Sequence, residues 1–315
     1  MSGFAGKTVL LTGATGFIGG ATARRLREAG ATVHGVSRRP PADGDTCDRW
    51  WPIDITEITA VRGVLAAVRP EIVFHLAGLS SGSRALDMVL RMVHVNLVGA
   101  VNLLVAATER PVARLVFAGS LEEPSPDGAW PVPASPYAAA KLGAGAYMRM
   151  FHALYGTPAL WLRLFMVYGP AQPDVQKLIP YVTLSLLRGE APALSSGTRL
   201  VDWVYIDDVV EGLMAAAVAE GLEGRTLDVG SGELVAVREV VAELERLVNP
   251  RVLPRFCAIP ERPMEQVRVA DAAATAALLG WRPRTPLKEG LAKTVDFYRR
   301  QVPGAAETLE VRVAQ

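Results

Sequence analysis

An α/β fold with a doubly wound parallel sheet is the architecture that this sequence predicts, and three observations predict it. Short apolar runs alternate with longer segments of helical periodicity along most of the chain. The apolar runs lack a polar–apolar alternation, which is typical of strands buried on both faces. A cluster of glycines separates the first apolar run from the first helical segment.

Six apolar runs rich in Val, Ile, Leu and Phe are expected to form the strands. In chain order they read KTVLLTG, ATVHGVS, EIVFHLAG, RLVFAGS, ALWLRLF and RTLDVGS. The helices are expected at Ile18–Ala29, Ile58–Val68, Ala85–Thr108, Pro136–Tyr155, Val175–Leu187, Asp207–Ala219 and Val237–Leu247. Because strands and helices alternate, helices should cover both faces of a parallel sheet.

The bulk composition excludes several classes of protein. The 315 residues carry a formal net charge of +1, which gives no electrostatic reason to expect binding to nucleic acid or to an acidic membrane. Cys47 and Cys257 are far apart, and the four histidines show no metal-ligand spacing, so neither a disulfide framework nor a metal site is expected. No signal peptide is evident, and no apolar run approaches the roughly 18 residues that span a bilayer. We therefore expect a cytoplasmic protein.

The glycine cluster predicts a phosphate-binding turn. TGATGFIG places Gly13, Gly16 and Gly19 three residues apart, after a strand and before a helix. Glycines there allow a tight turn and a close backbone approach to a pyrophosphate, and the helix N-terminus adds free N–H groups. We expect dinucleotide binding; a tight turn without a ligand is the alternative.

The end of the second strand bears on the choice of dinucleotide. Ser37, Arg38 and Arg39 stand where an acidic residue would bind the ribose of NAD. Arginine binds phosphate through a planar fork of donors, so we expect NADP rather than NAD, unless both arginines are solvated loop charges. Asp54 follows the expected third strand. We expect it either to contact the adenine or to cap the helix that begins near Thr56.

A tyrosine, a lysine and a serine form the candidate catalytic group. Tyr137 and Lys141 are four residues apart on one helix face. A phenol has a pKa of about 10, and a nearby ammonium together with the positive nicotinamide ring of an oxidised cofactor favours its ionised form and lowers that pKa. Ser120 ends a central strand, at the edge of the sheet where such folds bind ligands, and its hydroxyl can hold a substrate oxygen.

These motifs together resemble one family. TGATGFIGG, FHLAG, VNLVGAVNLL, SPYAAAK, LRLFMVYGP, DWVYIDDVV and LLGWRPRTPLKEGLAKTV follow the order and spacing of extended short-chain dehydrogenases/reductases of the NAD-dependent epimerase/dehydratase (nucleotide-sugar) family. The similarity runs from about Lys7 to Arg299. It implies a catalytic set of Ser120, Tyr137 and Lys141.

The resemblance also implies binding residues, domains and partners. Cofactor contacts are expected at Gly13, Thr15, Gly16, Phe17, Ile18, Gly19, Ser37, Arg38, Arg39, Asp54, Ile55, Leu76, Ala77, Gly78, Asn96, Ala118, Tyr137, Lys141, Leu164 and Val167. Substrate contacts are expected at Ser80, Ser120, Met166, Lys177, Leu178, Arg199 and Arg262. A dinucleotide-binding Rossmann domain is expected over residues 1–170, and a mainly substrate-binding lobe over 171–315, with 205–230 returning to the first sheet. A homodimer is expected through the two longest helices, and a sugar nucleotide as the substrate.

Some positions depart from the family pattern. Family 4,6-dehydratases carry Asp-Glu after the active-site Ser or Thr, whereas this chain has Leu121 and Glu122. Leu121 cannot protonate a leaving hydroxyl, while Glu122 is a residual acid/base or a loop carboxylate.

The expected phosphate-binding positions also differ. Met166 replaces an Asn, and Val201 replaces an Arg for which Arg199 can substitute. Asp228 replaces an Asn and is expected to repel a diphosphate, whereas Arg262 fits the pattern.

The expected function is an NADPH-dependent ketoreductase acting on a keto-sugar, such as a nucleotide-linked 4-keto-6-deoxyhexose. Tyr137 would donate the proton, Lys141 would lower its pKa and Ser120 would hold the oxygen. A nucleotide-sugar epimerase or a dehydratase-like enzyme with the same residues is the alternative. A redox-inactive dinucleotide-binding sensor is a third candidate, which the retained Ser, Tyr and Lys argue against.

Overall fold

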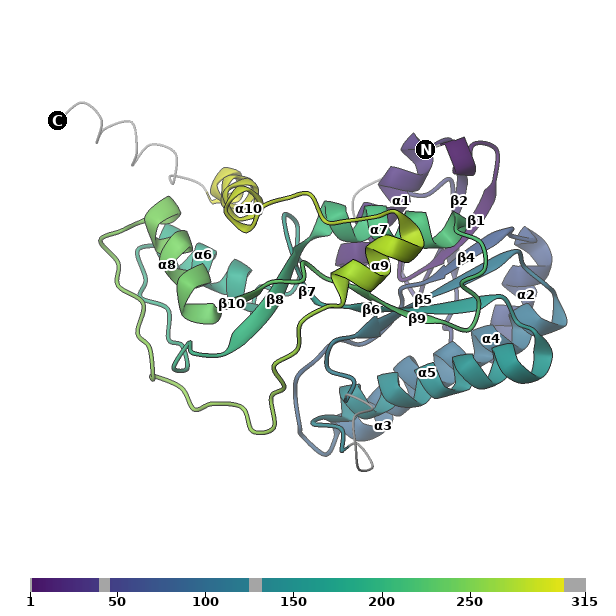
Figure 1. Cartoon of the computed structure of the whole chain (residues 1–315), viewed down its shortest axis with the longest axis horizontal. Coiled ribbons are helices and arrows are strands. Elements are labelled where there is room, and N and C mark those ends of the chain that lie inside the picture. Colours follow the sequence, from purple (N-terminus) through teal and green to yellow (C-terminus); the bar gives the residue numbers. More distant parts are fainter. Residues whose placement is uncertain (1, 40–45, 125–131, 303–315) are drawn as a thin grey trace. The chain divides into compact units, whose positions relative to one another are not determined.

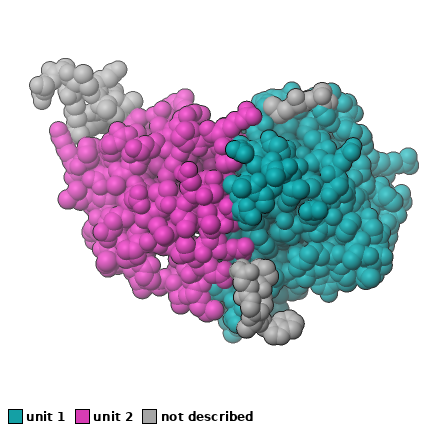
Figure 2. All heavy atoms as spheres, in the orientation of Figure 1, with its two compact units in different colours: residues 1–164, 209–229, 271–282 teal, residues 165–208, 230–270, 283–315 magenta. Residues whose placement is uncertain are grey.

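The computed structural model describes residues 2–39, 46–124 and 132–302. These residues form two compact units, coloured separately in Figure 2. Unit 1 comprises residues 1–164, 209–229 and 271–282, and unit 2 comprises residues 165–208, 230–270 and 283–315. The expected functional division at residue 170 stays a prediction.

A seven-stranded parallel sheet forms the centre of unit 1 (Figure 1). Its strands are β1 (Thr8–Thr12), β2 (Thr32–Ser37), β3 (Arg49–Pro52), β4 (Ile72–His75), β5 (Arg114–Ser120), β6 (Ala159–Leu164) and β9 (Thr226–Val229). Their order is β3-β2-β1-β4-β5-β6-β9, so the strand order reverses between β1 and β4. Such a reversal opens a crevice at the carboxyl ends of the strands, where ligands bind in doubly wound folds. The predicted fold class is confirmed.

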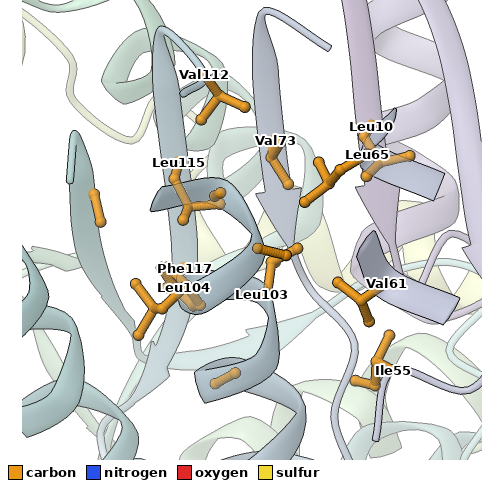
Figure 3. Close-up of a cluster of buried hydrophobic side chains, with 14 of the residues drawn as sticks. Leu10, Ile55, Val61, Leu65, Val73, Leu103, Leu104, Val112, Leu115 and Phe117 are labelled. Carbon is orange, nitrogen blue, oxygen red and sulfur yellow. The ribbon is translucent and has the colours of Figure 1, made fainter. Parts of the chain in front are cut away.

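Helices cover both faces of this sheet. On one face lie α2 (Ile58–Val68), α4 (Gly99–Glu109) and α5 (Pro136–Tyr155). Their apolar side chains interlock with those of the strands in one core, part of which is shown in Figure 3. The other face carries α1 (Phe17–Glu28) and α9 (Ala272–Leu279). The predicted bounds of α2 and α5 are confirmed.

The segment expected to form one α-helix over Ala85–Thr108 forms three consecutive helical segments. They are α3 (Met88–Met92), a π-helical turn η2 (Val93–Val98) and α4. The continuous run Met88–Glu109 is long and apolar enough to cross a membrane by length and composition alone, contrary to our expectation. Its segments pack against α2 and α5 within unit 1.

Unit 2 contains a three-stranded sheet that our strand assignment missed. Its strands are β7 (Met166–Tyr168), β8 (Leu200–Tyr205) and β10 (Leu234–Ala236), with β8 in the middle. The accompanying helices are α6 (Leu178–Leu187), α8 (Val237–Val248) and α10 (Leu287–Gln301), while α7 (Ile206–Val218) continues from unit 2 into unit 1. Helix α6 begins later than expected because Asp174 holds Gln176 and Lys177 in a turn.

A buried carboxylate ties three segments of unit 2 together. Asp202 on β8 is 1% exposed. It accepts hydrogen bonds from the backbone N–H and hydroxyl of Ser231, at 2.6 and 2.7 Å, and from the N–H groups of Gly232 and Ala270, at 3.0 and 2.9 Å. A buried charge is tolerated when it is hydrogen-bonded in this way.

We expect Asp202→Ala to lower the free energy of unfolding by about 2–4 kcal/mol, because buried donors would lose their acceptor. Chemical denaturation monitored by tryptophan fluorescence measures this. Glu109→Ala, which removes an exposed carboxylate paired with Arg62, is the control and should change little. Equal stability of the Asp202 variant and the wild type would show that the network does not stabilise the fold.

Candidate active site

The turn between β1 and α1 has space only for glycine at two positions. Gly13 has φ +75°, and a Cβ there would lie 2.6 Å from the backbone nitrogen of Ala77. A Cβ at Gly19 would lie 2.0 Å from the carbonyl oxygen of Gly13. No side chain caps the first turn of α1. Thr15 and Gly16 are exposed there, so the helix N-terminus presents backbone N–H groups to an incoming anion.

The two arginines after β2 are exposed, while Ser37 bonds within its own loop. Arg38 and Arg39 are exposed, and the Ser37 hydroxyl donates a hydrogen bond to the Arg39 carbonyl. The hydroxyl that we expected to meet a ribose phosphate therefore holds its own loop.

Asp54 and Ile55 lie in the segment just before α2. Asp54 accepts hydrogen bonds from the N–H and hydroxyl of Thr56, at 3.0 and 2.9 Å, which hold a turn ahead of the helix. The N-cap residue of α2 is Glu57, without a side-chain capping bond, so Asp54 does not cap this helix and its contact with the adenine stays a prediction. Ile55 is buried in the core, and its carbonyl accepts a hydrogen bond from Asn102. Any cofactor contact of Ile55 would come from its backbone.

Asn96, on the π-helical turn, shapes the loop after β4 that contains Leu76, Ala77 and Gly78. Its side chain accepts a hydrogen bond from the N–H of Leu79 at 2.8 Å and donates one to the Leu79 carbonyl at 3.0 Å. A Cβ at Gly78 would lie 2.9 Å from the Asn96 amide oxygen and 3.7 Å from Lys141 Nζ. Asn96 thus fixes this loop beside the lysine. Ser80, just beyond it, is exposed.

The carboxyl end of β5 and the start of α5 bring the three candidate catalytic side chains together. Ser135 caps α5 by accepting a hydrogen bond from Ala138, and the proline that follows suits the first helical turn. Tyr137 forms a hydrogen bond with the Ser120 hydroxyl. Lys141 Nζ lies 6.0 Å from the centre of the Tyr137 ring and donates a hydrogen bond to the Ala118 carbonyl at 2.7 Å.

Burial shifts the protonation equilibria of this group. It lowers the pKa of Lys141 to about 8, and the negative charge of Glu123 opposes this effect. Burial raises the pKa of Tyr137 above its usual value, while its hydrogen bond with Ser120 opposes the increase and the carboxylates of Glu122 and Glu123 add to it. Burial is the largest of these effects on Tyr137, and the lowering of the phenol pKa expected from Lys141 together with a positive nicotinamide ring stays a prediction.

The residues after Ser120 have distinct environments. Leu121 is buried and its N–H bonds to the carbonyl of Leu164, the last residue of β6. Glu122 is half-buried, its N–H donates to the Ser120 hydroxyl, and its carboxylate accepts a hydrogen bond from Ser135 at 3.3 Å. Glu122 therefore lies beside the catalytic group, as an acid or base would.

Two polar groups in unit 1 were not among the expected site residues, although a buried, structural role was expected for the histidine. Glu123 is buried and bonds to the backbone of Ser120, as described below. His75 bonds to the Thr12 hydroxyl at 2.8 Å, which links the ends of β4 and β1. Burial, with a smaller effect of Lys141, lowers the pKa of His75 to about 3, so this ring is neutral. The position of His75 at the end of an apolar run was the only signal for it.

Five of the expected substrate residues, and the expected cofactor contact Val167, belong to unit 2. The five are Met166, Lys177, Leu178, Arg199 and Arg262. Met166 and Val167 lie on β7, while Lys177 and Leu178 begin α6. Arg199 pairs with Glu265 at 2.9 Å, and Arg262 lies 3.9 Å from the same carboxylate. The two expected phosphate-binding arginines thus share one carboxylate that the sequence analysis missed.

Asp228, in unit 1, forms an ion pair with Arg163 at 2.6 Å. Its charge is therefore compensated by a neighbour on the adjacent strand. The expectation that Asp228 repels a diphosphate is not supported by this pairing.

Comparisons with known proteins agree with this geometry. Residues 9–230 match the model of the NAD dependent epimerase/dehydratase family. A UDP-glucose 4-epimerase from Mycolicibacterium smegmatis is 30% identical over 312 residues, which cover 93% of this chain and 98% of the relative. A dTDP-glucose 4,6-dehydratase from Neisseria meningitidis is 28% identical, over 93% of each chain.

Solved structures give the same result. The UDP-glucose 4-epimerase of Thermus thermophilus in complex with NAD superposes with a TM-score of 0.82 at 28% identity, covering 94% of this chain and 100% of that one. The chain therefore belongs to the NAD-dependent epimerase/dehydratase family, and is an enzyme of the extended short-chain dehydrogenase/reductase type, as its motifs predicted.

Proposed function

We propose that the chain is an NAD-dependent nucleotide-sugar epimerase, which inverts the configuration at one sugar carbon by transient oxidation and re-reduction of that carbon. The observation that carries this proposal is the convergence of Ser120, Tyr137 and Lys141 at the carboxyl end of β5. Relatives that match nearly the whole chain include UDP-sugar 4-epimerases, which favours this reaction over our first expectation of a ketoreductase.

The glycine turn fits a dinucleotide. The backbone around Gly13 and Gly19 leaves no space for a side chain, so a diphosphate can approach the N-terminus of α1 closely. When bound, the cofactor supplies the hydride acceptor and donor, and in its oxidised form a positive ring charge. The cofactor contacts named from the sequence remain part of this proposal.

Proton transfer is the task of the chain's own residues. Tyr137 is protonated in the resting protein, because burial raises its pKa. To accept the proton of the sugar hydroxyl it must ionise, which additional positive charge beside it favours. Ser120 holds the sugar oxygen next to the phenol, and Lys141 stabilises the phenolate.

Leu121 argues against elimination of water by the mechanism of the family dehydratases. This side chain is apolar and buried, so it carries no proton to a leaving hydroxyl at the position that family dehydratases use. Glu122 retains one carboxylate beside Ser120 and Ser135, and in the epimerase it contacts the sugar or assists its proton exchange.

A ketoreductase that uses NADPH is the second candidate. The exposed Arg38 and Arg39 after β2 favour it, since two exposed guanidinium groups suit a 2′-phosphate. In either reaction, Ser80, Met166, Lys177, Leu178, Arg199 and Arg262 are the proposed substrate-side residues.

An apolar stripe on α5 favours a homodimer. Tyr147, Met150 and Leu154 are exposed at helical spacing on one face of α5. Leu86, two residues before α3, and Leu90, within α3, are also exposed, and α3 contacts α5 within unit 1. A second copy of the chain covers this surface in the proposed assembly.

We expect Tyr137→Phe to reduce kcat by about 10²–10⁴-fold, because the phenol carries the transferred proton. The measurement is the rate of epimerisation of UDP- and dTDP-sugars in the presence of NAD, monitored by NMR. Tyr155→Phe, at an exposed tyrosine at the end of the same helix, is the control and should retain activity. A Tyr137→Phe enzyme with a near wild-type rate would contradict the assignment of the proton carrier.

Gly19→Ala should weaken NAD binding at least about tenfold, because the new methyl group displaces the Gly13 carbonyl from the phosphate-binding turn. Isothermal titration calorimetry measures the change. Gly63→Ala is the matched control: it lies on α2 with no atom near the added Cβ, and should leave NAD affinity unchanged. Unaltered affinity in a folded Gly19→Ala variant would contradict the proposed phosphate site.

The choice of cofactor separates the two candidate functions. We expect NAD to bind at least as tightly as NADP, and the double variant Arg38→Ala/Arg39→Ala to keep its NAD affinity within about twofold, because both side chains are exposed. Calorimetric titration of both cofactors tests this. A large preference for NADP that the double variant loses, with stoichiometric NADPH consumption by keto-sugars, would favour the ketoreductase.

A further inference from the structure

Glu123 is a buried carboxylate that the proposed reaction does not explain. It follows the catalytic serine by three residues and is only 4% exposed. Its neighbour Glu122 is half-buried and contacts hydroxyl groups, so the two adjacent glutamates have different surroundings. A charge removed from water this completely needs compensating interactions.

Those interactions hold the peptide groups of Ser120. Glu123 Oε1 accepts a hydrogen bond from the Ser120 N–H at 2.7 Å, and the Glu123 N–H donates one to the Ser120 carbonyl at 3.1 Å. The same Oε1 accepts a hydrogen bond from Trp161 Nε1 at 2.9 Å, which anchors it to β6. The position of the Ser120 backbone therefore depends on this carboxylate.

Gly119 provides the space for this arrangement. A Cβ at this position would lie 2.1 Å from Trp161 Nε1 and 2.6 Å from Glu123 Oε1. Because Gly119 has no side chain, the Glu123 carboxylate and the Trp161 indole can contact the backbone at the end of β5.

The charge of Glu123 also acts on Lys141. Lys141 Nζ lies 5.9 Å from the centre of the Trp161 ring, whose N–H bonds to Glu123. Glu123 raises the pKa of Lys141 against the effect of burial. Its other charged neighbour, Arg163, lies 3.9 Å away, while the closer ion pair of that arginine is with Asp228.

The remaining titratable groups around Lys141 do not replace this charge. His75 on β4 is neutral, because burial lowers its pKa to about 3. Tyr137 is a neutral phenol in the resting state, because burial raises its pKa. Glu122 influences Tyr137, whereas the only carboxylate found to influence Lys141 among the described residues is Glu123.

We propose that Glu123 is a positioning residue, which fixes Ser120 through its backbone and supplies the negative charge beside Lys141. The proposal deepens the proposed function and rests on it for the role of Ser120 and Lys141. The two effects are separable by substitution: Glu123→Gln retains an acceptor oxygen but loses the charge, while Glu123→Ala loses both.

A direct test uses the small number of lysines. The chain has five, Lys7, Lys141, Lys177, Lys288 and Lys293, so ¹³Cε-labelled lysine gives few NMR signals and Lys141→Arg assigns the one of interest. In the full-length wild-type protein, we expect the Lys141 signal to titrate with a midpoint near its lowered pKa of about 8. In Glu123→Gln, the midpoint should fall by about one pH unit, because the stabilising negative charge is gone.

Kinetics supply the second readout. Activity requires the ammonium, so it should fall as the pH rises through the Lys141 midpoint, and in Glu123→Gln this fall should move to lower pH with KM unchanged. Glu123→Ala should in addition lose about 10- to 100-fold in kcat at every pH, because Ser120 is displaced. Since the NMR titration needs no substrate, it remains decisive even if the epimerase assignment fails.

Asp202→Asn is the matched control, because it also neutralises a buried carboxylate that accepts backbone hydrogen bonds, in unit 2. It should leave the Lys141 midpoint unchanged. The proposal is overturned if the Lys141 midpoint in a folded Glu123→Gln variant equals that of the wild type. It is also overturned if Asp202→Asn produces the same shift.

Discussion

The burial of one ammonium group constrains the whole candidate site. Lys141 is 6% exposed, and its Nζ donates a hydrogen bond to the Ala118 carbonyl in β5. A buried charge requires such partners, so α5 must pack close to the end of β5. The same packing brings Tyr137, one turn earlier on α5, to the Ser120 hydroxyl. Helix capping by Ser135 fixes where that turn begins.

The parallel sheet determines which segments can meet this ammonium. The strand order reverses between β1 and β4, so the glycine turn after β1 and the loop after β4 lie at the same edge. Thr12 and His75 join these two ends, and Asn96 holds the loop that passes Lys141. Backbone geometry thus places the glycine turn and the proposed proton-transfer residues at one sheet edge, within unit 1.

The sequence predicts the elements of unit 1 well, because their signals are local. Apolar runs identify the buried strands, and the glycine spacing and the Tyr-Lys spacing each lie within one segment. What it does not reveal depends on pairings between distant segments. The ion pair of Asp228 with Arg163, the sharing of Glu265 by two arginines, and the sheet of unit 2 are all of this kind. The burial that raises the pKa of Tyr137 is likewise not a local property of the sequence.

The pair Glu122–Glu123 illustrates why residue type alone does not define a reaction. Two adjacent glutamates follow Ser120 closely, but the acid and base positions of the family dehydratases, directly after the serine, correspond to Leu121 and Glu122. Glu123 instead uses one carboxylate oxygen for the Ser120 backbone and the Trp161 indole, and protonating it would weaken both bonds. Only Glu122 remains near the hydroxyl groups of Ser120 and Ser135, and Leu121 carries no proton. A single accessible carboxylate next to a tyrosine and a buried ammonium suits reversible proton transfer at one oxygen better than the coordinated removal of water.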